Sequence, residues 1–191
     1  MAVVLIRHGA TEWSVTGKHT SFTDVPLTAS GRRDAERVSE RLARREFGLV
    51  LTSPRSRARL TAELAGYGDV AEIDEDLSEV DYGEYEGRTT PEIRTEVPGW
   101  SVWTHGSPGG ETVDQTGART DRVIERALAA DGDTLLFAHG HLLRILGARW
   151  IDLPAVYGGN LLLHTGSICE LGFERERRAI VLWNDTLHLK S

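Results

Sequence analysis

Three short apolar runs, rich in branched side chains, are each followed directly by polar residues, and this recurrence constrains the fold more than any other feature. They are Ala2–Ile6 before Arg7-His8-Gly9, Leu49–Thr52 before Ser53, and Thr134–Ala138 before His139-Gly140. Runs of this length and composition are typical of buried strands. Segments with helical spacing of apolar residues separate them, and strands that alternate with helices predict an α/β fold with helices on both faces of the sheet.

Helices are expected wherever apolar residues recur every three or four positions. The expected helices run from Ser30-Gly31 to about Gly48, from Ser56 to Gly66, from the capping box Thr112-Val113-Asp114-Gln115 to Asp131, and from Leu142 to Pro154. The other expected elements are a helical turn at Pro91–Arg94, a strand at Val70–Ile73 and a terminal strand pair, Ser167–Phe173 and Ala179–Trp183. The turn within that pair implies at least one antiparallel strand. We therefore expect a three-layer α/β/α sandwich around a mostly parallel mixed sheet.

Two stretches interrupt the alternation of strands and helices. Ala10–Ala29 is a polar, glycine-containing loop, and a loop of that length inside a compact domain is usually functional or mobile. Asp74–Glu111 is rich in acidic, aromatic, proline and glycine residues and has no lasting period of 2 or 3.6. We expect residues 74–111 to form a small cap over one end of the sheet, within a single domain that covers residues 1–191.

Composition restricts the partners and the cellular setting. The chain has 191 residues, which suits one domain, and a formal net charge of −7, which argues against nucleic acid as the main partner. No apolar stretch reaches transmembrane length and no leader precedes the first strand, so we expect a cytoplasmic protein without a membrane partner. Cys169 is the single cysteine, and we expect it to be a buried structural thiol. The sequence leaves the oligomeric state open, with a homodimer among the options.

The polar residues at the three strand ends carry the functional prediction. Ligands of open α/β sheets bind beyond the carboxyl ends of the strands, so Arg7-His8, Ser53 with Arg57, and His139 should meet at one edge. A neutral imidazole is a competent nucleophile, and a guanidinium binds phosphate through two parallel hydrogen bonds. The helices expected after Ser53 and His139 add free N–H groups and positive dipole ends. Arg-His-Gly alone is more simply a polar strand end, so the prediction of a phosphate site depends on all three segments.

Four motifs resemble those of the histidine phosphatase superfamily, in the branch that contains the cofactor-dependent phosphoglycerate mutases, and they occur in the family's order. They are Arg7-His8-Gly9, Ser53-Pro54-x-x-Arg57-Ala58, Leu77-Ser78-Glu79 ahead of Tyr82-Gly83-x-Tyr85-Glu86-Gly87, and His139-Gly140. The resemblance covers almost the whole chain and implies a phosphoglycerate mutase-like fold. Within the family, the chain is most similar to short acid phosphatases and sugar bisphosphatases. The segments that carry this closer similarity are Thr11-Glu12-Trp13-Ser14, Tyr82–Gly87 and His139-Gly140-His141.

The resemblance also implies a mechanism. Neutral His8 attacks phosphorus and forms a phosphohistidine, and Glu79 acts as general acid and base. Three groups bind the non-bridging oxygens, namely Arg7, Arg57 and His139. The carboxyl groups that compete with Glu79 for its role are those of Asp76, Asp81 and Glu84. No metal or cofactor is required, because the arginines supply the positive charge, and we expect them to lower the proton affinity of His8 as well.

Further residues are candidates for substrate contact because they lie in the first loop, in the cap or beside His139. They are Ser14, Thr20, Ser21, Tyr82, Gly140 and His141, together with Trp13, Trp103 and His105, and packing is the alternative for each side chain. His141 is undecided between lining the pocket and starting a helix. Arg55 is expected to face solvent, and three histidines are expected to be structural or at the surface, namely His19, His164 and His188. No other ligand-type residues accompany His139 and His141 at metal-binding spacing, so no metal site is predicted.

We expect a metal-independent phosphatase for small phosphorylated metabolites. The alternatives are a mutase that moves phosphate between hydroxyls, a dedicated sugar bisphosphatase, and a non-catalytic phosphate-binding module. Mutases of the family are typically longer, with a C-terminal tail, whereas this chain ends at Ser191 soon after its last expected strand. The main cations of the cap are Arg88 and Arg94, so a second phosphate group has no obvious binding site, which favours a monoesterase. A binding module would usually have lost a catalytic residue.

Overall fold

A six-stranded mixed sheet, in the order β3-β2-β4-β1-β5-β6, forms the centre of the computed structural model, which describes residues 1–43 and 45–190. The strands are β1 (Val3–Arg7), β2 (Leu49–Thr52), β3 (Glu72–Ile73), β4 (Thr134–Ala138), β5 (Ile168–Glu174) and β6 (Arg177–Asp185). The first four strands are parallel to one another, and β5 and β6 add an antiparallel hairpin at the β1 edge. The predicted α/β class with a mixed sheet is therefore confirmed.

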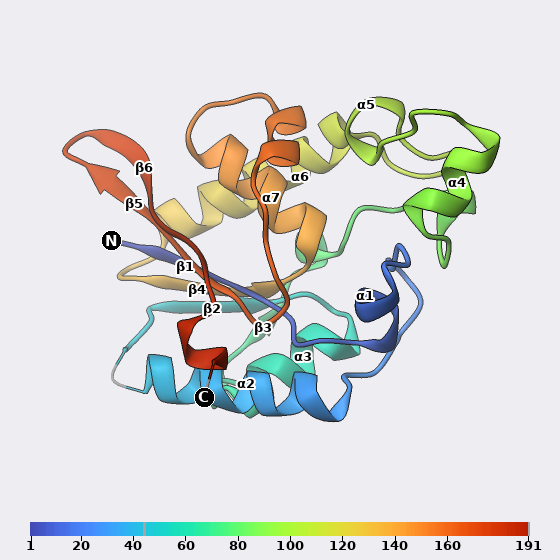
Figure 1. Cartoon of the computed structure of the whole chain (residues 1–191). Helices are drawn as coiled ribbons and strands as arrows, with labels where there is room; N and C mark the ends of the chain where they lie inside the picture. The colour runs from blue at the N-terminus through green and yellow to red at the C-terminus, as the bar shows by residue number, and fades with distance from the viewer. Residues whose placement is uncertain (44, 191) are drawn as a thin grey trace.

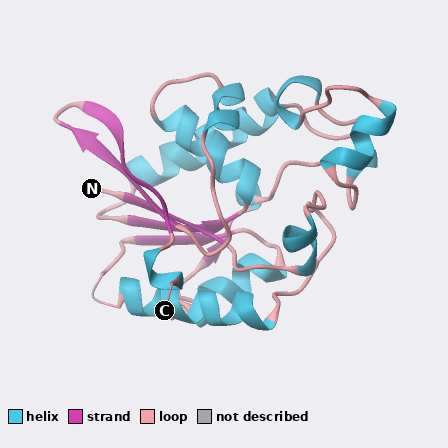
Figure 2. Ribbon diagram, in the orientation of Figure 1, coloured by secondary structure: helices cyan, strands magenta, loops and turns pink. Residues whose placement is uncertain are grey.

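Helices cover both faces of the sheet, as Figure 2 shows. On one face lie α2 (Ala29–Leu42) and α3 (Ser56–Leu64), and on the other lie α6 (Val113–Ala129) and α7 (Gly140–Trp150) (Figure 1). Side chains of β1 alternate between the two faces of the sheet. Val4 and Ile6 pack against α2 and α3, whereas Val3 and Leu5 pack against α6 and α7. This arrangement is the predicted three-layer sandwich.

The segment expected to form a cap contains two short helices, α4 (Thr90–Glu96) and α5 (Val102–His105), which lie beyond the end of the sheet toward which β1 runs (Figure 1). Two 3-10 turns precede them, at Glu75–Leu77 and Gly83–Tyr85. The cap has an apolar cluster of its own, in which Tyr82 and Trp100 pack with Ile145 of α7. The cap is thereby fixed against the same helix that begins at the end of β4.

The first loop contains a helix that we did not predict. Thr11 and Ser14 form a capping box, in which the Thr11 N–H donates to Ser14 Oγ at 2.9 Å and the Ser14 N–H donates to Thr11 Oγ1 at 3.1 Å. This box starts α1 (Glu12–Thr16), which ends at Gly17, a residue in the left-handed conformation with φ of 76°. The polar stretch from residue 10 to 29 is therefore partly helical.

Several expected boundaries also differ from the structure. Helix α2 is capped by Thr28 and ends at Leu42, and Phe47 packs beyond it, with its ring 5.6 Å from that of Tyr67. Arg44, which falls inside the expected helix, lies outside the described residues. Strand β3 is shorter than expected, and β6 is longer at both ends, with only residues 175 and 176 in the hairpin turn. Local patterns find such elements but not where tertiary packing ends them.

Candidate active site

His8 follows β1 directly and is 5% exposed. Its Nδ1 lies 2.7 Å from the carbonyl oxygen of Gly9. Because a carbonyl only accepts hydrogen bonds, Nδ1 carries the proton and Nε2 keeps its lone pair. Burial holds the pKa of His8 well below its usual value, and Arg57 and Arg7 lower that pKa further. The expected effect of the arginines is present, but burial is the larger cause.

The turn after His8 fits only glycine. A Cβ on Gly9 would lie 2.2 Å from the carbonyl oxygen of Gly31, at the start of α2. The N–H of Gly9 donates to Thr61 Oγ1 at 3.1 Å, and this hydroxyl donates to the carbonyl of Arg57 at 2.7 Å. The segment that carries His8 is therefore packed closely against α2 and hydrogen-bonded to α3, so its position is closely defined.

The three strand ends meet as predicted. The ring centroids of His8 and His139 are 5.2 Å apart. Arg57, on α3, donates from Nε to His139 Nδ1 at 3.3 Å, and His139 Nε2 lies 2.7 Å from the hydroxyl of Ser53. Since Nδ1 accepts, Nε2 carries the proton, and this N–H donates a hydrogen bond to the hydroxyl oxygen of Ser53. Burial is the main reason why the pKa of His139 lies well below its usual value, so this ring is neutral like that of His8.

Neither Arg57 nor His139 is among the residues that line the cavity, whereas the resemblance implies that both bind the phosphoryl oxygens. Arg57 is 1% exposed, because its guanidinium donates to the carbonyl oxygens of Thr23 at 3.0 Å, Thr20 at 3.2 Å and Ser21 at 2.9 Å. The polar first loop thus supplies acceptors that local sequence could not reveal. Arg57 contributes positive charge and fixes His139 in place.

Arg7 does face the cavity, which has a volume of about 270 Å³ and also includes His8, Glu79 and Gly140 in its lining. The Arg7 guanidinium donates from one terminal nitrogen to the carbonyl of Leu163 at 2.6 Å, whereas its buried Nε has no hydrogen-bond partner among the described residues. A Cβ on Gly140 would lie 3.1 Å from the guanidinium carbon of Arg7. Glycine at this position therefore lets a free donor lie against the N-terminus of α7, an arrangement that suits an anion.

Glu79 supplies the only carboxyl group in the lining of this cavity among the described residues. It is 6% exposed, and its carboxylate accepts from the backbone N–H groups of His141 at 3.0 Å and Leu142 at 2.8 Å, in the first turn of α7. Its own neighbour Val80 donates to it at 3.0 Å. None of the three competing carboxyl groups lines the cavity, and Asp76 instead pairs with Arg122 at the surface.

Three aromatic side chains form a polar but uncharged wall of the cavity. The hydroxyl of Tyr82 lies 2.6 Å from His141 Nδ1, and the ring centroids of Tyr82 and His19 are 4.7 Å apart. Burial lowers the pKa of His19 to about 4, lowers that of His141 well below its usual value, and raises that of Tyr82. His141 therefore lines the cavity, and His19 lines it too, although we expected it to be structural or at the surface.

Two cations of the cavity were missed by the sequence analysis. Lys18 and Arg144 belong to the lining, and within the described part of the chain neither forms an ion pair. Arg144 lies over the ring of Trp103, 4.5 Å from its centroid, and donates to the carbonyls of residues 158 and 159. The cations expected in the cap point elsewhere, since Arg88 pairs with Glu96 and Arg94 donates to a backbone carbonyl. Helical spacing from His139-Gly140 was the available signal for Arg144.

The remaining candidates have mixed outcomes. Ser14 and Thr20 line the cavity, although the Ser14 hydroxyl is engaged in the capping box of α1. Ser21 lies behind the wall, and its hydroxyl donates to the carbonyl of Glu79 at 3.4 Å. The residues outside the lining are Trp13, Trp103, His105 and Arg55, together with His164 and His188. Arg55 instead lies over the ring of Phe22, 4.9 Å from its centroid.

Other expected features concern the rest of the molecule. Cys169 is buried as predicted, and burial raises its thiol pKa to about 12. In the described part of the chain, no three His, Cys, Asp or Glu side chains are grouped as metal ligands. None of the helices within residues 1–43 and 45–190 is both long and apolar enough to cross a membrane.

The fold and this cluster define an α/β protein with a histidine–arginine site at the carboxyl edge of its sheet. Residues 3–186 match the family model of the histidine phosphatase superfamily (branch 1). An acid phosphatase of Mycobacterium tuberculosis is 43% identical over 190 residues, which cover 97% of this chain and 93% of that protein. Sedoheptulose 1,7-bisphosphatase of Saccharomyces cerevisiae is 36% identical over 183 residues, which cover 78% of this chain and 67% of that protein. The solved structure of a Mycobacterium tuberculosis open reading frame gives a TM-score of 0.91 at 42% identity, over 96% of both chains. The chain therefore belongs to the histidine phosphatase superfamily.

Proposed function

We propose that this protein is a phosphatase that hydrolyses small phosphomonoesters through a phosphohistidine on His8, without a metal ion. The observation that carries the proposal is the state of His8, a neutral ring with a free Nε2 in the lining of a cavity to which Arg7 and Glu79 also belong. The acid phosphatase relative supports this class of reaction.

The proposed reaction has two steps. In the first, His8 Nε2 attacks phosphorus, the ester P–O bond breaks, and Glu79 gives its proton to the leaving oxygen. In the second, Glu79 takes a proton from water, the water oxygen bonds to phosphorus, and the P–N bond to His8 breaks to release inorganic phosphate. Arg7 and the backbone N–H of Gly140, at the start of α7, bind the phosphoryl oxygens, and Arg57 adds charge from behind His139. These donors are fixed by the fold before the substrate binds, so little reorganisation accompanies the reaction.

The charge of the cavity favours a substrate that carries a second anionic group. Among the described residues, three cationic side chains line it, Arg7, Lys18 and Arg144, and Glu79 is the only acidic one. Arg57 lies close to His139 and adds a further positive charge. A phosphomonoester brings at most two negative charges, which leaves a net positive charge among these side chains. This observation favours a sugar bisphosphatase as the second candidate function, consistent with the bisphosphatase relative.

The first experiment tests the nucleophile. His8→Asn should abolish hydrolysis of 4-nitrophenyl phosphate measured in the presence of EDTA, and wild-type protein quenched during turnover should carry an acid-labile phosphoryl group that the variant lacks. His105→Asn is the matched control, because His105 is exposed and lies outside the cavity. Hydrolysis by the His8 variant at the wild-type rate would refute the proposal.

The second experiment tests the substrate class. Arg144→Met should raise KM for a sugar bisphosphate more than for the corresponding monophosphate, whereas Arg88→Met in the cap should change neither. Equal effects on both substrates would refute the second anionic group. Incubation with 3-phosphoglycerate separates a phosphatase, which releases phosphate, from a mutase, which yields the 2-isomer.

A further inference from the structure

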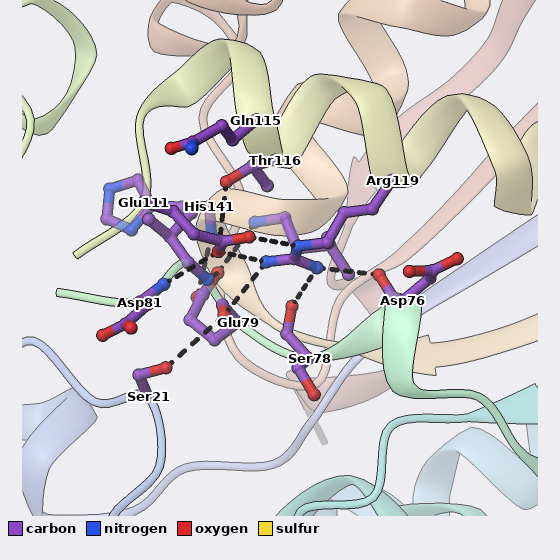
Figure 3. Close-up of polar contacts among 12 residues, drawn as sticks. Ser21, Asp76, Ser78, Glu79, Asp81, Glu111, Gln115, Thr116, Arg119 and His141 are labelled. Atoms are coloured by element: carbon purple, nitrogen blue, oxygen red, sulfur yellow. Dashed lines mark hydrogen bonds and ion pairs between the residues drawn. The ribbon is translucent and has the colours of Figure 1, made fainter. Parts of the chain in front are cut away.

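Arg119, on α6, lies outside the cavity but directly behind Glu79 (Figure 3). It is a buried arginine whose charge is compensated by Glu111, to which Nε and one terminal nitrogen donate at 2.9 Å each. Its other terminal nitrogen donates to the carbonyl oxygens of Asp76 at 2.7 Å and Ser78 at 2.6 Å. The terminal nitrogen that donates to Glu111 also donates to the carbonyl of Glu79 at 3.1 Å. One guanidinium thus holds three carbonyls of the segment that carries Glu79.

That segment has no regular hydrogen-bonding pattern of its own. Residues 78–82 connect two 3-10 turns and belong to no strand or helix. Buried backbone groups must be paired, and here the partners come from side chains distant in sequence. Arg119 lies 40 residues beyond Glu79 in the chain. The backbone at Glu79 is therefore placed by α6 rather than by local structure.

Glu111 extends the same network to the other side of Glu79. Its Oε2 accepts from the backbone N–H of Asp81 at 3.0 Å and from the hydroxyl of Thr116 at 3.4 Å, in addition to Arg119 (Figure 3). The Arg119–Glu111 pair thus binds carbonyls at and before Glu79 and an N–H two residues after it. The pair fixes both the position and the direction of this stretch of backbone.

Glu79 is consequently held at two points. Arg119 holds its carbonyl, and the N–H groups of His141 and Leu142 in α7 hold its carboxylate. A proton donor displaced by about 1 Å loses on the order of a hundredfold in rate. We propose that Arg119, together with Glu111, is a positioning residue that sets the location of the Glu79 carboxyl for proton transfer. This inference rests on the proposed function, in which Glu79 protonates the leaving oxygen.

The test uses the leaving group of the substrate. An alkyl phosphate such as glycerol 2-phosphate needs a proton on its leaving oxygen, whereas 4-nitrophenolate leaves readily without one. The measured quantity is the ratio of kcat/KM for glycerol 2-phosphate to kcat/KM for 4-nitrophenyl phosphate, because kcat/KM covers the steps up to phosphohistidine formation. Glu79→Gln should lower this ratio by about a hundredfold, and Arg119→Met should lower it by about tenfold or more.

The matched control is Arg122→Met. Arg122 lies one turn further along α6, its side chain is 60% exposed, and it pairs with the side chain of Asp76 in the same segment. Its loss should leave the ratio unchanged. In the Glu79→Gln background, Arg119→Met should lower the ratio no further, because Arg119 acts through Glu79.

Three results separate the inference from the function on which it rests. Wild-type protein without phosphatase activity would refute the proposed function. An active wild type whose folded Arg119→Met variant keeps the wild-type ratio would refute the positioning role alone, as would an equal fall of the ratio in the Glu79→Gln background. If Arg119→Met does not fold, the same ratio of kcat/KM values is measured for Arg119→Lys. A lowered ratio supports the positioning role, and a wild-type ratio refutes it.

Discussion

His19 provides a quantitative test of how burial sets protonation at the cavity. Its ring packs against Tyr82 and Trp100, with centroids 4.7 and 5.2 Å away, and its Nε2 lies 3.3 Å from the hydroxyl of Thr90. Burial lowers its pKa to about 4, from about 6.5 in the unfolded chain. The perturbation is His19→Gln, because a glutamine amide can replace the Nε2 hydrogen bond but does not titrate.

The expected size follows from the two pKa values. Above about pH 6.5 the ring is neutral in both states and its ionisation adds nothing. As the pH falls below 6.5, the unfolded chain binds a proton that the folded protein does not, so the folded state loses stability until the pH reaches about 4. Between pH 7 and pH 5 this linkage costs the wild-type protein about 2 kcal/mol.

The assay is urea unfolding at pH 7.0 and pH 5.0, followed by tryptophan fluorescence, for both proteins. The wild type should lose about 2 kcal/mol more than His19→Gln over this interval, whatever the two stabilities are at pH 7. Comparing the losses removes the packing cost of the substitution, which acts at both pH values. If the two proteins lose the same free energy, the ring is not held neutral by burial, and the account of this wall of the cavity is wrong.

Three further predictions concern the nucleophile and its support. Ser53→Ala should lower the free energy of unfolding by about 1–3 kcal/mol and reduce activity, because the buried Nε2–H of His139 loses its hydrogen-bond acceptor at 2.7 Å. An unchanged urea midpoint would contradict this prediction. Gly9→Ala should destabilise the protein by more than about 2 kcal/mol, because its Cβ would lie 2.2 Å from the backbone of α2, and thermal unfolding at the wild-type temperature would show that the turn can relax. Since the pKa of His8 is well below its usual value, kcat/KM corrected for substrate ionisation should stay level as the pH falls through 6.5 and decline only at lower pH. A decline of kcat/KM with its midpoint near pH 6.5 would contradict a buried neutral nucleophile.

Sequence patterns were sufficient where strands and short motifs determine position. The apolar runs before Arg7-His8, Ser53 and His139 identified three strands, and the rule that ligands bind at the carboxyl ends brought their polar residues together. The capping box at Thr112 likewise placed the start of α6 at the correct residue. These features depend on neighbours in sequence, which a single chain displays.

The missed features depend on partners far away in sequence. The contacts of Arg119 with the Glu79 segment join residues 40 to 43 positions apart, and the acceptors of Arg57 lie 34 to 37 positions away. Nothing local distinguishes Arg119 from the exposed Arg122 on the same helix. The partners of Arg57 could not be predicted for a similar reason, because the sequence does not show that loop carbonyls accept hydrogen bonds from its guanidinium.

The binding of the Glu79 carboxylate by N–H groups of the first turn of α7 has a consequence for how this scaffold can diverge. Helix α7 binds the carboxylate of Glu79, begins at Gly140 and carries the cation Arg144, so these three parts of the site move with one helix. A shift of α7 would change both the rate of turnover and the affinity for the substrate, so a change in this helix cannot alter one of these properties alone. New selectivity is more readily acquired through α1, α4 and α5, whose remodelling leaves the segment that carries Glu79 where it is.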